Sequence, residues 1–297
     1  MPNLKNLKIR IKSVKSTQKI TAAMKMVAAA KLRRAHENAE ASRPYASRME
    51  RMIGSLAKAS AGNEGAPPML AGTGYDQTHL IVPFTADRGL CGSFNGSIIR
   101  ETRKMANELR GQGKTVKLFC VGRKGREALK REFGDNIIEH VQGIGRRSVT
   151  YGEAAELGEK IAILFESCQF DVCTFIFNRF KSAMTQVLTR QQIIPFIASP
   201  GQDDEEDDDD RFRASFIFEP EEADILAELL PRNIGVQMFQ ALVESAASEH
   251  GARMTAMDSA TRNAGEMIDS LTLIYNRTRQ AFITKELIEI ISGAEAL

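Results

Sequence analysis

The stretch Asp87–Asn95, DRGLCGSFN, comes closest in residue types and spacing to an active-site loop. It follows an apolar, β-rich run and precedes a helical pattern, where loops at the carboxyl end of a parallel sheet lie. The same residues suit a tight turn, because Gly89 and Gly92 tolerate backbone angles that other residues avoid. Ser93 or Asn95 is then available to cap the following helix. A structural turn and a functional site are therefore equal alternatives.

Two other glycine-containing runs fail as phosphate-binding motifs. In Gly111–Thr115, GQGKT, the position five before Gly113 is Glu108 instead of glycine, and the loop leaves a helix and enters a strand. Gly143–Arg147, GIGRR, is followed by Ser148, where a dinucleotide-binding fingerprint needs its third glycine. We therefore predict no nucleotide cofactor and no catalytic residue in this chain.

The histidines and cysteines lack the spacing of a metal or redox site. The histidines are scattered, and no neighbouring base for Cys91 is identifiable from the sequence. We expect reduced thiols in a cytosol-like compartment and no bound metal. These residues are His36, His79, His140 and His250, with Cys91, Cys120, Cys168 and Cys173.

The middle of the chain alternates strand-like and helix-like segments. This order predicts a largely parallel, Rossmann-like sheet with helices on its faces. With 297 residues, the chain has room for one such α/β domain and a helical section besides. The predicted strands are His79–Thr85, Thr115–Val121 and Asp171–Asn178, and the predicted helices between them are Ile98–Leu109, Lys124–Phe133 and Glu153–Glu166.

Changes in composition mark the ends of this domain. Residues 63–74 are rich in Gly, Ala and Pro, and the eight consecutive acidic residues Asp203–Asp210 repel one another, as in a solvated loop. Their spacing does not match a calcium-binding loop. The domains that we predict are a coiled-coil helix (1–58), a Rossmann-like α/β domain (75–200), an acidic linker (201–215), and a foot segment with a long C-terminal helix (216–297).

The last third of the chain predicts one continuous helix. From Asn233 to Leu297 there is no proline, and the glycines are isolated. At a rise of ~1.5 Å per residue, a helix from Asn233 to Ile291 is on the order of 90 Å long, which is too long for one small domain. Steps of three and four residues place one coiled-coil seam along Met254, Met257, Thr261, Ala264, Ile268, Leu271, Tyr275, Thr278 and Phe282.

The N-terminal segment supplies the second helix of an antiparallel coiled coil. Ten basic residues precede its first acidic residue, Glu37, which is typical of a transit peptide, a nucleic-acid arm or a structural helix that meets acidic partners. The apolar pattern continues to Leu32 and favours the structural helix. A slip in the spacing resembles a stutter between the fourth and fifth of the predicted seam residues Leu4, Leu7, Ile11, Val14, Ile20, Met24 and Val27.

The end of the C-terminal helix is apolar on more sides than one seam needs. At ~100° per residue, its large apolar residues cover an arc of roughly 240°. We expect this end to be surrounded, either by the chain's own globular domain or by other subunits. The residues are Phe282, Ile283, Leu287, Ile288, Ile290 and Ile291.

Several segments closely resemble the gamma subunit of F-type ATP synthases, over essentially the whole chain. They are ITAAMKMVAAAKLRRA (20–35), DRGLCGSFN, ARMTAMDSATRNA (252–264) and ITKELIEIISGAEAL (283–297). The resemblance implies the central stalk of a proton-translocating rotary motor, inside a ring of alternating alpha and beta subunits that hold the nucleotide sites. Such a chain couples rotation of the membrane-embedded c ring to conformational cycling of the beta subunits, and is not itself an enzyme.

The resemblance also implies subunit contacts along the two long helices. Arg279 and Gln280 match residues that contact a catch loop of one beta subunit, and both offer several hydrogen-bond donors. Met24 and Lys25 match the segment that faces the acidic lever region of the beta subunits. An ordinary exposed helix residue is the alternative at each position. Three apolar contacts are predicted at the helix end: Ile283, Leu287 and Ile291.

The foot segment FIFEP, Phe216–Pro220, matches the part of the family that lies near the membrane ring and the epsilon subunit. Phe216, Phe218 and Glu219 are therefore candidate contacts. One face of a strand on the sheet is the alternative for the two aromatic residues.

The resemblance implies a peripheral membrane protein on the cytoplasmic face of a bacterial inner membrane, with the mitochondrial matrix face as the alternative. The sequence has no secretory signal and no run of about 18 apolar residues. We expect no nucleic-acid partner. The competing hypothesis is a stand-alone Rossmann-like nucleotide-binding enzyme.

Overall fold

The computed structural model describes residues 3–59, 67–145, 148–196 and 222–295. It divides into two units: unit 1 combines Met1–Ala30 with Arg253–Leu297, and unit 2 is Lys31–Ala252. The helices α1 (Leu4–Ala59) and α6 (Glu222–Glu295) each contribute to both units. The predicted acidic linker and foot residues Phe216, Phe218 and Glu219 lie outside the described residues.

Unit 2 contains the predicted Rossmann-like sheet. Its strands are β1 (Thr78–Pro83), β2 (Thr115–Val121), β3 (Ile137–Val141), β4 (Val172–Phe180) and β5 (Gln186–Ile194), in the order β3-β2-β1-β4-β5. The first four are parallel, and β5 pairs antiparallel with β4. The sheet confirms the predicted fold class, although only β1, β2 and β4 among its strands are predicted from the sequence.

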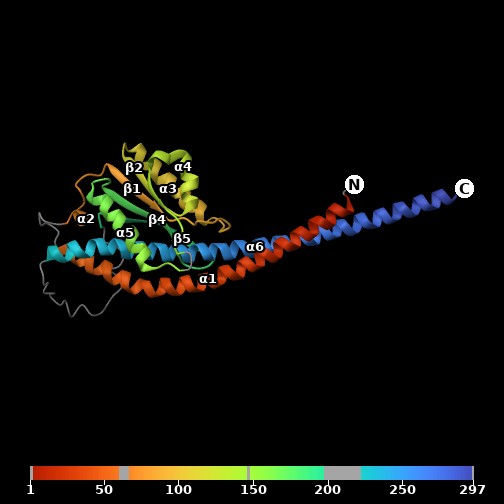
Figure 1. Cartoon of the computed structure of the whole chain (residues 1–297), viewed down its shortest axis with the longest axis horizontal. Coiled ribbons are helices and arrows are strands. Elements are labelled where there is room, and N and C mark those ends of the chain that lie inside the picture. Colours follow the sequence, from red (N-terminus) through yellow and green to blue (C-terminus); the bar gives the residue numbers. More distant parts are fainter. Residues whose placement is uncertain (1–2, 60–66, 146–147, 197–221, 296–297) are drawn as a thin grey trace. The chain divides into compact units, whose positions relative to one another are not determined.

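Helices cover both faces of the sheet (Figure 1). Alternate residues of β1 point to opposite faces, as a pleated strand requires. Leu80 and Val82 pack in the cluster that includes α5 (Tyr151–Glu166) and α6, while Ile81 packs in the cluster that includes α3 (Phe94–Gly111) and α4 (Arg123–Phe133). Shorter elements are α2 (Pro68–Ala71) and the 3-10 turn η1 (Gly134–Asn136).

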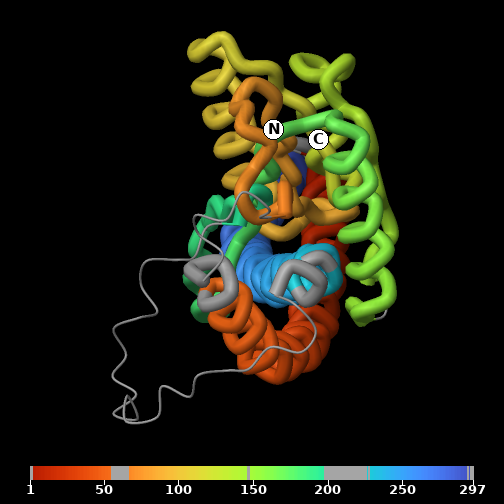
Figure 2. The backbone as a smooth tube through the Cα atoms, turned by 90° about the vertical axis from the view of Figure 1, so that its left-hand side faces the viewer, coloured from red at the N-terminus to blue at the C-terminus, as the bar shows by residue number. Residues whose placement is uncertain are grey.

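Within unit 2, α6 is enclosed between the sheet and α1 (Figure 2). Ile234, Met238 and Leu242 pack into the core on the sheet side, while Leu226 and Leu230 pack against α1. At the crossing of α5 and α6, a Cβ added to Gly158 would lie 2.9 Å from Gly235 Cα, so the two backbones are in direct contact. α6 begins at Glu222 and runs through Pro231, which is earlier than the predicted start at Asn233.

In unit 1, α1 and α6 pack as the predicted antiparallel pair (Figure 1). The α6 seam is confirmed as far as Thr278, because its residues from Met254 onward are all buried or half-buried. Phe282, the last predicted seam residue, is 49% exposed.

The α1 seam differs from the prediction. Ile20 and Val27, assigned to the seam, are 58% and 59% exposed. The heptad instead continues without a stutter through polar and small residues. Thr21 lies in the seam, since its hydroxyl oxygen is 2.8 Å from that of Thr261 in a hydrogen bond. The buried or half-buried positions that follow this heptad are Leu4, Leu7, Ile11, Val14, Gln18, Thr21, Lys25 and Ala28; Ala22, Met24 and Ala29 beside it are half-buried as well.

Candidate functional site

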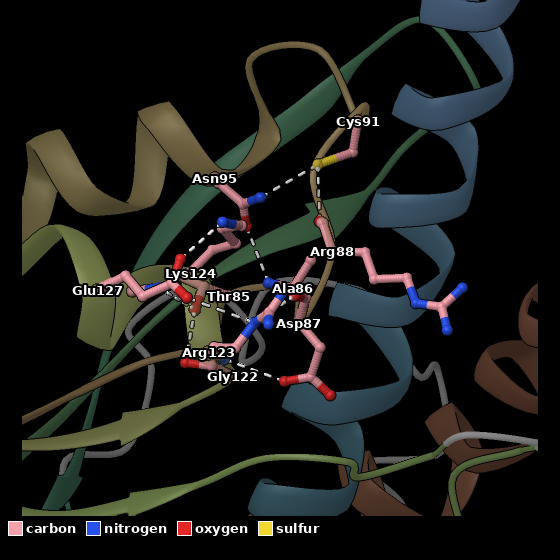
Figure 3. Close-up of polar contacts among 11 residues, drawn as sticks. Thr85, Ala86, Asp87, Arg88, Cys91, Asn95, Gly122, Arg123, Lys124 and Glu127 are labelled. Atoms are coloured by element: carbon pink, nitrogen blue, oxygen red, sulfur yellow. Dashed lines mark hydrogen bonds and ion pairs between the residues drawn. The ribbon is translucent and has the colours of Figure 1, made fainter.

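The turn after β1 is held by its own side chains (Figure 3). Asp87 accepts a hydrogen bond at each carboxylate oxygen: Oδ1 from the Arg123 backbone N–H (3.0 Å) and Oδ2 from the Gly143 backbone N–H (2.7 Å). These two donors are the first residue of α4, which follows β2, and a residue of the loop after β3. One carboxylate therefore ties together the segments that follow β1, β2 and β3 at the carboxyl edge of the sheet.

The N-terminus of α4 lies at the carboxyl edge of the sheet, and like other helix N-termini it could present backbone N–H groups to a phosphate. Here those groups are already bonded. Besides the Arg123–Asp87 bond, Lys124 N–H donates to the Ala86 carbonyl (3.1 Å) and Gly125 N–H to Thr85 Oγ1 (2.8 Å). Gly122, with φ 91°, allows this approach, since a Cβ there would meet the Thr85 carbonyl oxygen at 1.9 Å. The chain caps this helix itself.

The predicted roles within DRGLCGSFN are only partly right. Gly92 has a positive φ of 55°, but the second left-handed residue is Leu90 (φ 62°) and not Gly89. Ser93 occupies the N-cap of α3 without a side-chain capping bond. Asn95 lies inside α3 instead: its Oδ1 accepts from the Ala86 N–H (2.8 Å) and its Nδ2 donates to Cys91 Sγ (3.2 Å). The stretch acts as a braced turn.

The topological switch point of the sheet lies between β1 and β4, where α/β enzymes bind ligands. In this chain α6 crosses that point. The Ser245 hydroxyl donates to the Phe84 carbonyl (3.4 Å), and the Ser248 hydroxyl donates to the Asn178 carbonyl (2.8 Å). A helix therefore occupies the usual ligand crevice, and the hypothesis of a stand-alone nucleotide-binding enzyme gains no support.

No disulfide is present within the described residues, and Cys91, Cys120 and Cys173 are buried. Burial raises the pKa of Cys120 to about 12 and raises that of Cys173 as well, so both thiols stay protonated near neutral pH. Cys168 is exposed. Within the described residues, no group of three or more potential metal ligands is found.

The strongest candidate for a functional surface is the α6 tip, which we define as Arg279–Ser292. Every residue of this stretch is exposed, although it carries six large apolar side chains. Their exposure ranges from 49% at Phe282 to 71% at Ile290. Exposed apolar groups of this density mark an interaction site.

The helix register explains why the tip is bare. Thr21 pairs with Thr261, and Lys25 with Asp258, so each step back along α1 corresponds to a step forward along α6. Because both helices rise equally per residue, Leu4 lies level with about residue 278 of α6. Beyond this level α6 continues past the start of α1 (Figure 1).

The structure brings five predicted contact residues together on the α6 tip: Arg279, Gln280, Ile283, Leu287 and Ile291. Met24 is half-buried on α1. Lys25 Nζ lies 2.6 Å from Asp258 Oδ1, and this bond holds the pKa of Asp258 below its ordinary value. The Lys25 charge is thus already engaged within the coiled coil.

Sequence reasoning missed an apolar stripe on the outer side of α1. Ile9, Ile20 and Val27 are all more than half exposed. Steps of 11 and 7 residues return to nearly the same side of a helix, so these three side chains share a face. That spacing was the available signal, but Ile20 and Val27 were assigned to the seam.

Within the described ranges, no helix combines the length and hydropathy needed to cross a membrane.

Comparisons with known proteins agree over the whole length. A family model described as "ATP synthase" matches residues 3–297. The ATP synthase gamma chain of Paramagnetospirillum magneticum is 58% identical over 297 residues, and that of Rhodospirillum rubrum is 59% identical over 300 residues. Both matches cover 100% of this chain and 100% of the relative.

Solved structures give the same picture. The central stalk and c-ring structure of the mitochondrial ATP synthase of Tetrahymena thermophila includes a chain that is 27% identical, with a TM-score of 0.61 over 81% of this chain and 99% of that one. A rotor chain of the Euglena gracilis mitochondrial ATP synthase reaches a TM-score of 0.66 over 94% of this chain and 98% of that one. At 18% identity, this second likeness concerns the fold alone.

Proposed function

The chain belongs to the ATP synthase family of gamma chains, and from this premise we propose which of its surfaces serve rotation. It is a central-stalk subunit of the rotary motor, part of a membrane-bound complex, and carries no catalytic site of its own. We propose that the α6 tip turns inside a sleeve formed by the ring of alternating alpha and beta subunits.

The exposure of the α6 tip carries this proposal. Its apolar side chains are distributed around most of the helix and have no cover within the described chain. Because exposed apolar area is unfavourable in water, a partner that surrounds the helix stabilises the assembly. An apolar sleeve also suits rotation, since it offers no directional hydrogen bonds that would hold the rotor at one angle.

Arg279 and Gln280 stand at the base of the tip and supply what the apolar part lacks. Both are exposed, and both offer several donors to carboxylates or carbonyls of a beta-subunit catch loop. A rotor that touches each beta subunit differently gives each a different preferred conformation and nucleotide affinity. Turning the rotor then cycles the beta subunits through these states.

The remaining contacts belong to the same proposal. Met24 and the outer side of α1 face the beta subunits, whereas Phe216, Phe218 and Glu219 in the foot segment contact the epsilon subunit and the c ring. The chain lies on the cytoplasmic face of a bacterial inner membrane and serves a proton-driven enzyme. The proposal also includes the division into a coiled-coil helix (1–58), a Rossmann-like domain (75–200), an acidic linker (201–215) and a foot segment with the C-terminal helix (216–297).

Co-purification tests the proposal most directly. A tagged chain recovered gently from its native cells should bring with it an ATPase complex that contains alpha and beta subunits. Recovery of a lone soluble chain would overturn the proposal.

A tip variant tests the surface itself. Replacing Ile283, Leu287 and Ile291 by Gln should weaken assembly or lower ATP-driven torque, while the unfolding midpoint of the isolated chain stays unchanged because these side chains are already exposed. Met184→Gln is the matched control, since Met184 is 84% exposed in the β4–β5 hairpin of unit 2. Equal torque and assembly in the tip variant and the control would exclude the α6 tip as the bearing.

A further inference from the structure

One buried carboxylate in unit 2 joins both long helices to the sheet. Arg43 of α1 donates from Nε and Nη2 to Glu244 Oε1 of α6, at 2.9 and 2.8 Å. The other oxygen, Glu244 Oε2, accepts from the Phe180 N–H at the end of β4 (2.8 Å). Arg43 Nη2 also reaches the Phe180 carbonyl at 3.4 Å. We call Arg43, Glu244 and the Phe180 backbone the Glu244 clamp.

The burial of this group needs an explanation. The Glu244 side chain is 2% exposed and that of Arg43 is 36% exposed. Removing a carboxylate from water is unfavourable, and well-packed apolar residues often stabilise a fold as well as a buried ion pair does. Stability alone therefore gives no reason for charge here. Directional, charge-assisted bonds add a fixed geometry, which apolar packing does not.

Neighbouring contacts also fix both long helices to the sheet at this point. On α6, the adjacent Ser245 donates to the Phe84 carbonyl just after β1, and Ser248, one turn further along, donates to the Asn178 carbonyl of β4. On α1, the His36 ring packs against the Phe180 ring at a centroid distance of 5.3 Å. A Cβ added to Gly251 would lie 3.3 Å from Ala183 Cα, so α6 also approaches the β4–β5 hairpin closely. Both helices are thus held at the same end of β4.

We propose that the Glu244 clamp is a positioning site for torque: it makes the sheet domain turn together with both helices of the stalk. This inference rests on the proposed rotor function. Torque that enters a stalk through a lateral domain has to reach α1 as well as α6. Between apolar helices, axial slip changes the buried area little, whereas slip at the clamp breaks charge-assisted hydrogen bonds in a buried site.

Three variants separate a mechanical role from a merely structural one. Arg43→Met leaves the Glu244 charge buried without its partner and should lower the unfolding midpoint most. The double variant R43M/E244Q removes both charges and keeps an amide oxygen to accept from the Phe180 N–H, so it should restore the midpoint. Arg190→Met is the matched control, because Arg190 forms ion pairs with Glu101 and Glu108 that connect β5 only to α3.

The readout is the twisting fluctuation of the assembled enzyme, held by its alpha and beta subunits and stalled with inhibitor. A probe on Cys168, the exposed cysteine of the described part of unit 2, reports the angle of the sheet domain once other reactive cysteines are removed. R43M/E244Q should broaden the distribution of sheet-domain angles and lower the number of ions pumped per ATP hydrolysed. The control should match the wild type in both.

The outcomes are distinguishable. If R43M/E244Q recovers the unfolding midpoint and also keeps the wild-type angular width and pumping, the clamp is merely structural and the inference is overturned. If the wild-type chain itself neither assembles nor rotates, the proposed rotor function fails instead. A broadened distribution in a stably folded double variant supports the clamp.

Discussion

Two stretches of α6 are each apolar on most sides of the helix but have opposite environments. Residues 233–248 are nearly all buried within unit 2, whereas Arg279–Ser292 are all exposed in unit 1. The first stretch packs into the core of the sheet, and Arg43 of α1 bonds to its Glu244. The second lies beyond the start of α1. A helix that is apolar on most sides needs cover, and the comparison shows which part of it the chain supplies itself.

The two stretches also differ in their polar contacts. In the buried stretch, Glu244 and Ser248 bond to the backbone of β4. On the tip, the Thr284 hydroxyl donates to the Gln280 carbonyl, and Lys285 pairs with Glu289, so both contacts stay within the helix. Directional bonds to other elements fix an angle, and their absence permits rotation. The buried stretch is therefore suited to hold the helix rigidly to the sheet, and we call it the joint. The tip is suited to turn against its partners, and we call it the bearing.

The largest predicted effect breaks the joint. Met238 is fully buried against the sheet. Met238→Ala should lower the free energy of unfolding by about 2–5 kcal/mol, because it leaves a cavity in a close-packed core. Denaturant unfolding of the full-length chain measures this loss. A loss below about 0.5 kcal/mol would mean that the buried stretch is no better packed than a surface helix.

A second change tests how closely α6 approaches its neighbour. Gly158→Ala introduces a Cβ that would lie 2.9 Å from Gly235 Cα, so the two helices have to separate. We expect a cost of about 1–3 kcal/mol from overpacking. Gly152→Ala is the matched control in the same helix, since its Cβ would meet no atom within 4 Å. Equal unfolding midpoints for the two variants would contradict the close crossing.

A smaller, pH-dependent effect concerns the coiled coil of unit 1. The hydrogen bond from Lys25 lowers the pKa of Asp258 below its ordinary value of 3.8. The pair therefore contributes stability above that value and loses it as the pH falls through the depressed pKa of the folded state. Asp258→Asn should flatten this acid limb of the unfolding curve only slightly, because the pair is partly exposed. An unchanged acid limb would show that the pair adds no stability.

How well the sequence predicts the fold differs from one strand to another. β1, β2 and β4 are strongly apolar runs and were predicted, whereas β3 contains Glu139 and His140 and β5 contains Arg190. Edge strands such as β3, with one side partly open, lack the apolar density that marks a central strand. The sheet order needed tertiary packing and was beyond any local pattern.

The coiled coil shows the same limit at single residues. The α6 seam followed from spacing, because its apolar and small residues coincide with the heptad. On α1 the apolar residues Ile20 and Val27 are exposed, and the neighbouring Thr21 and Ala28 take the seam. Close approach of two helices favours small residues, which a search for apolar bulk overlooks. The tip was expected to be surrounded because its apolar arc exceeds one seam, which needs only helix geometry. Its subunit contacts were predicted from the resemblance to the gamma subunit.

The smallest predicted effect on stability sharpens the comparison most. Ile290→Gln should change the unfolding free energy of the isolated chain by no more than about 0.5 kcal/mol, because the side chain is 71% exposed and leaves no cavity. In the assembled enzyme the same change places an amide inside an apolar sleeve, where an unpaired polar group costs about 1–3 kcal/mol. The variant should therefore lower the unfolding temperature of the complex without altering that of the chain alone. If both respond equally, the tip is covered by its own chain in solution, and the distinction between joint and bearing fails.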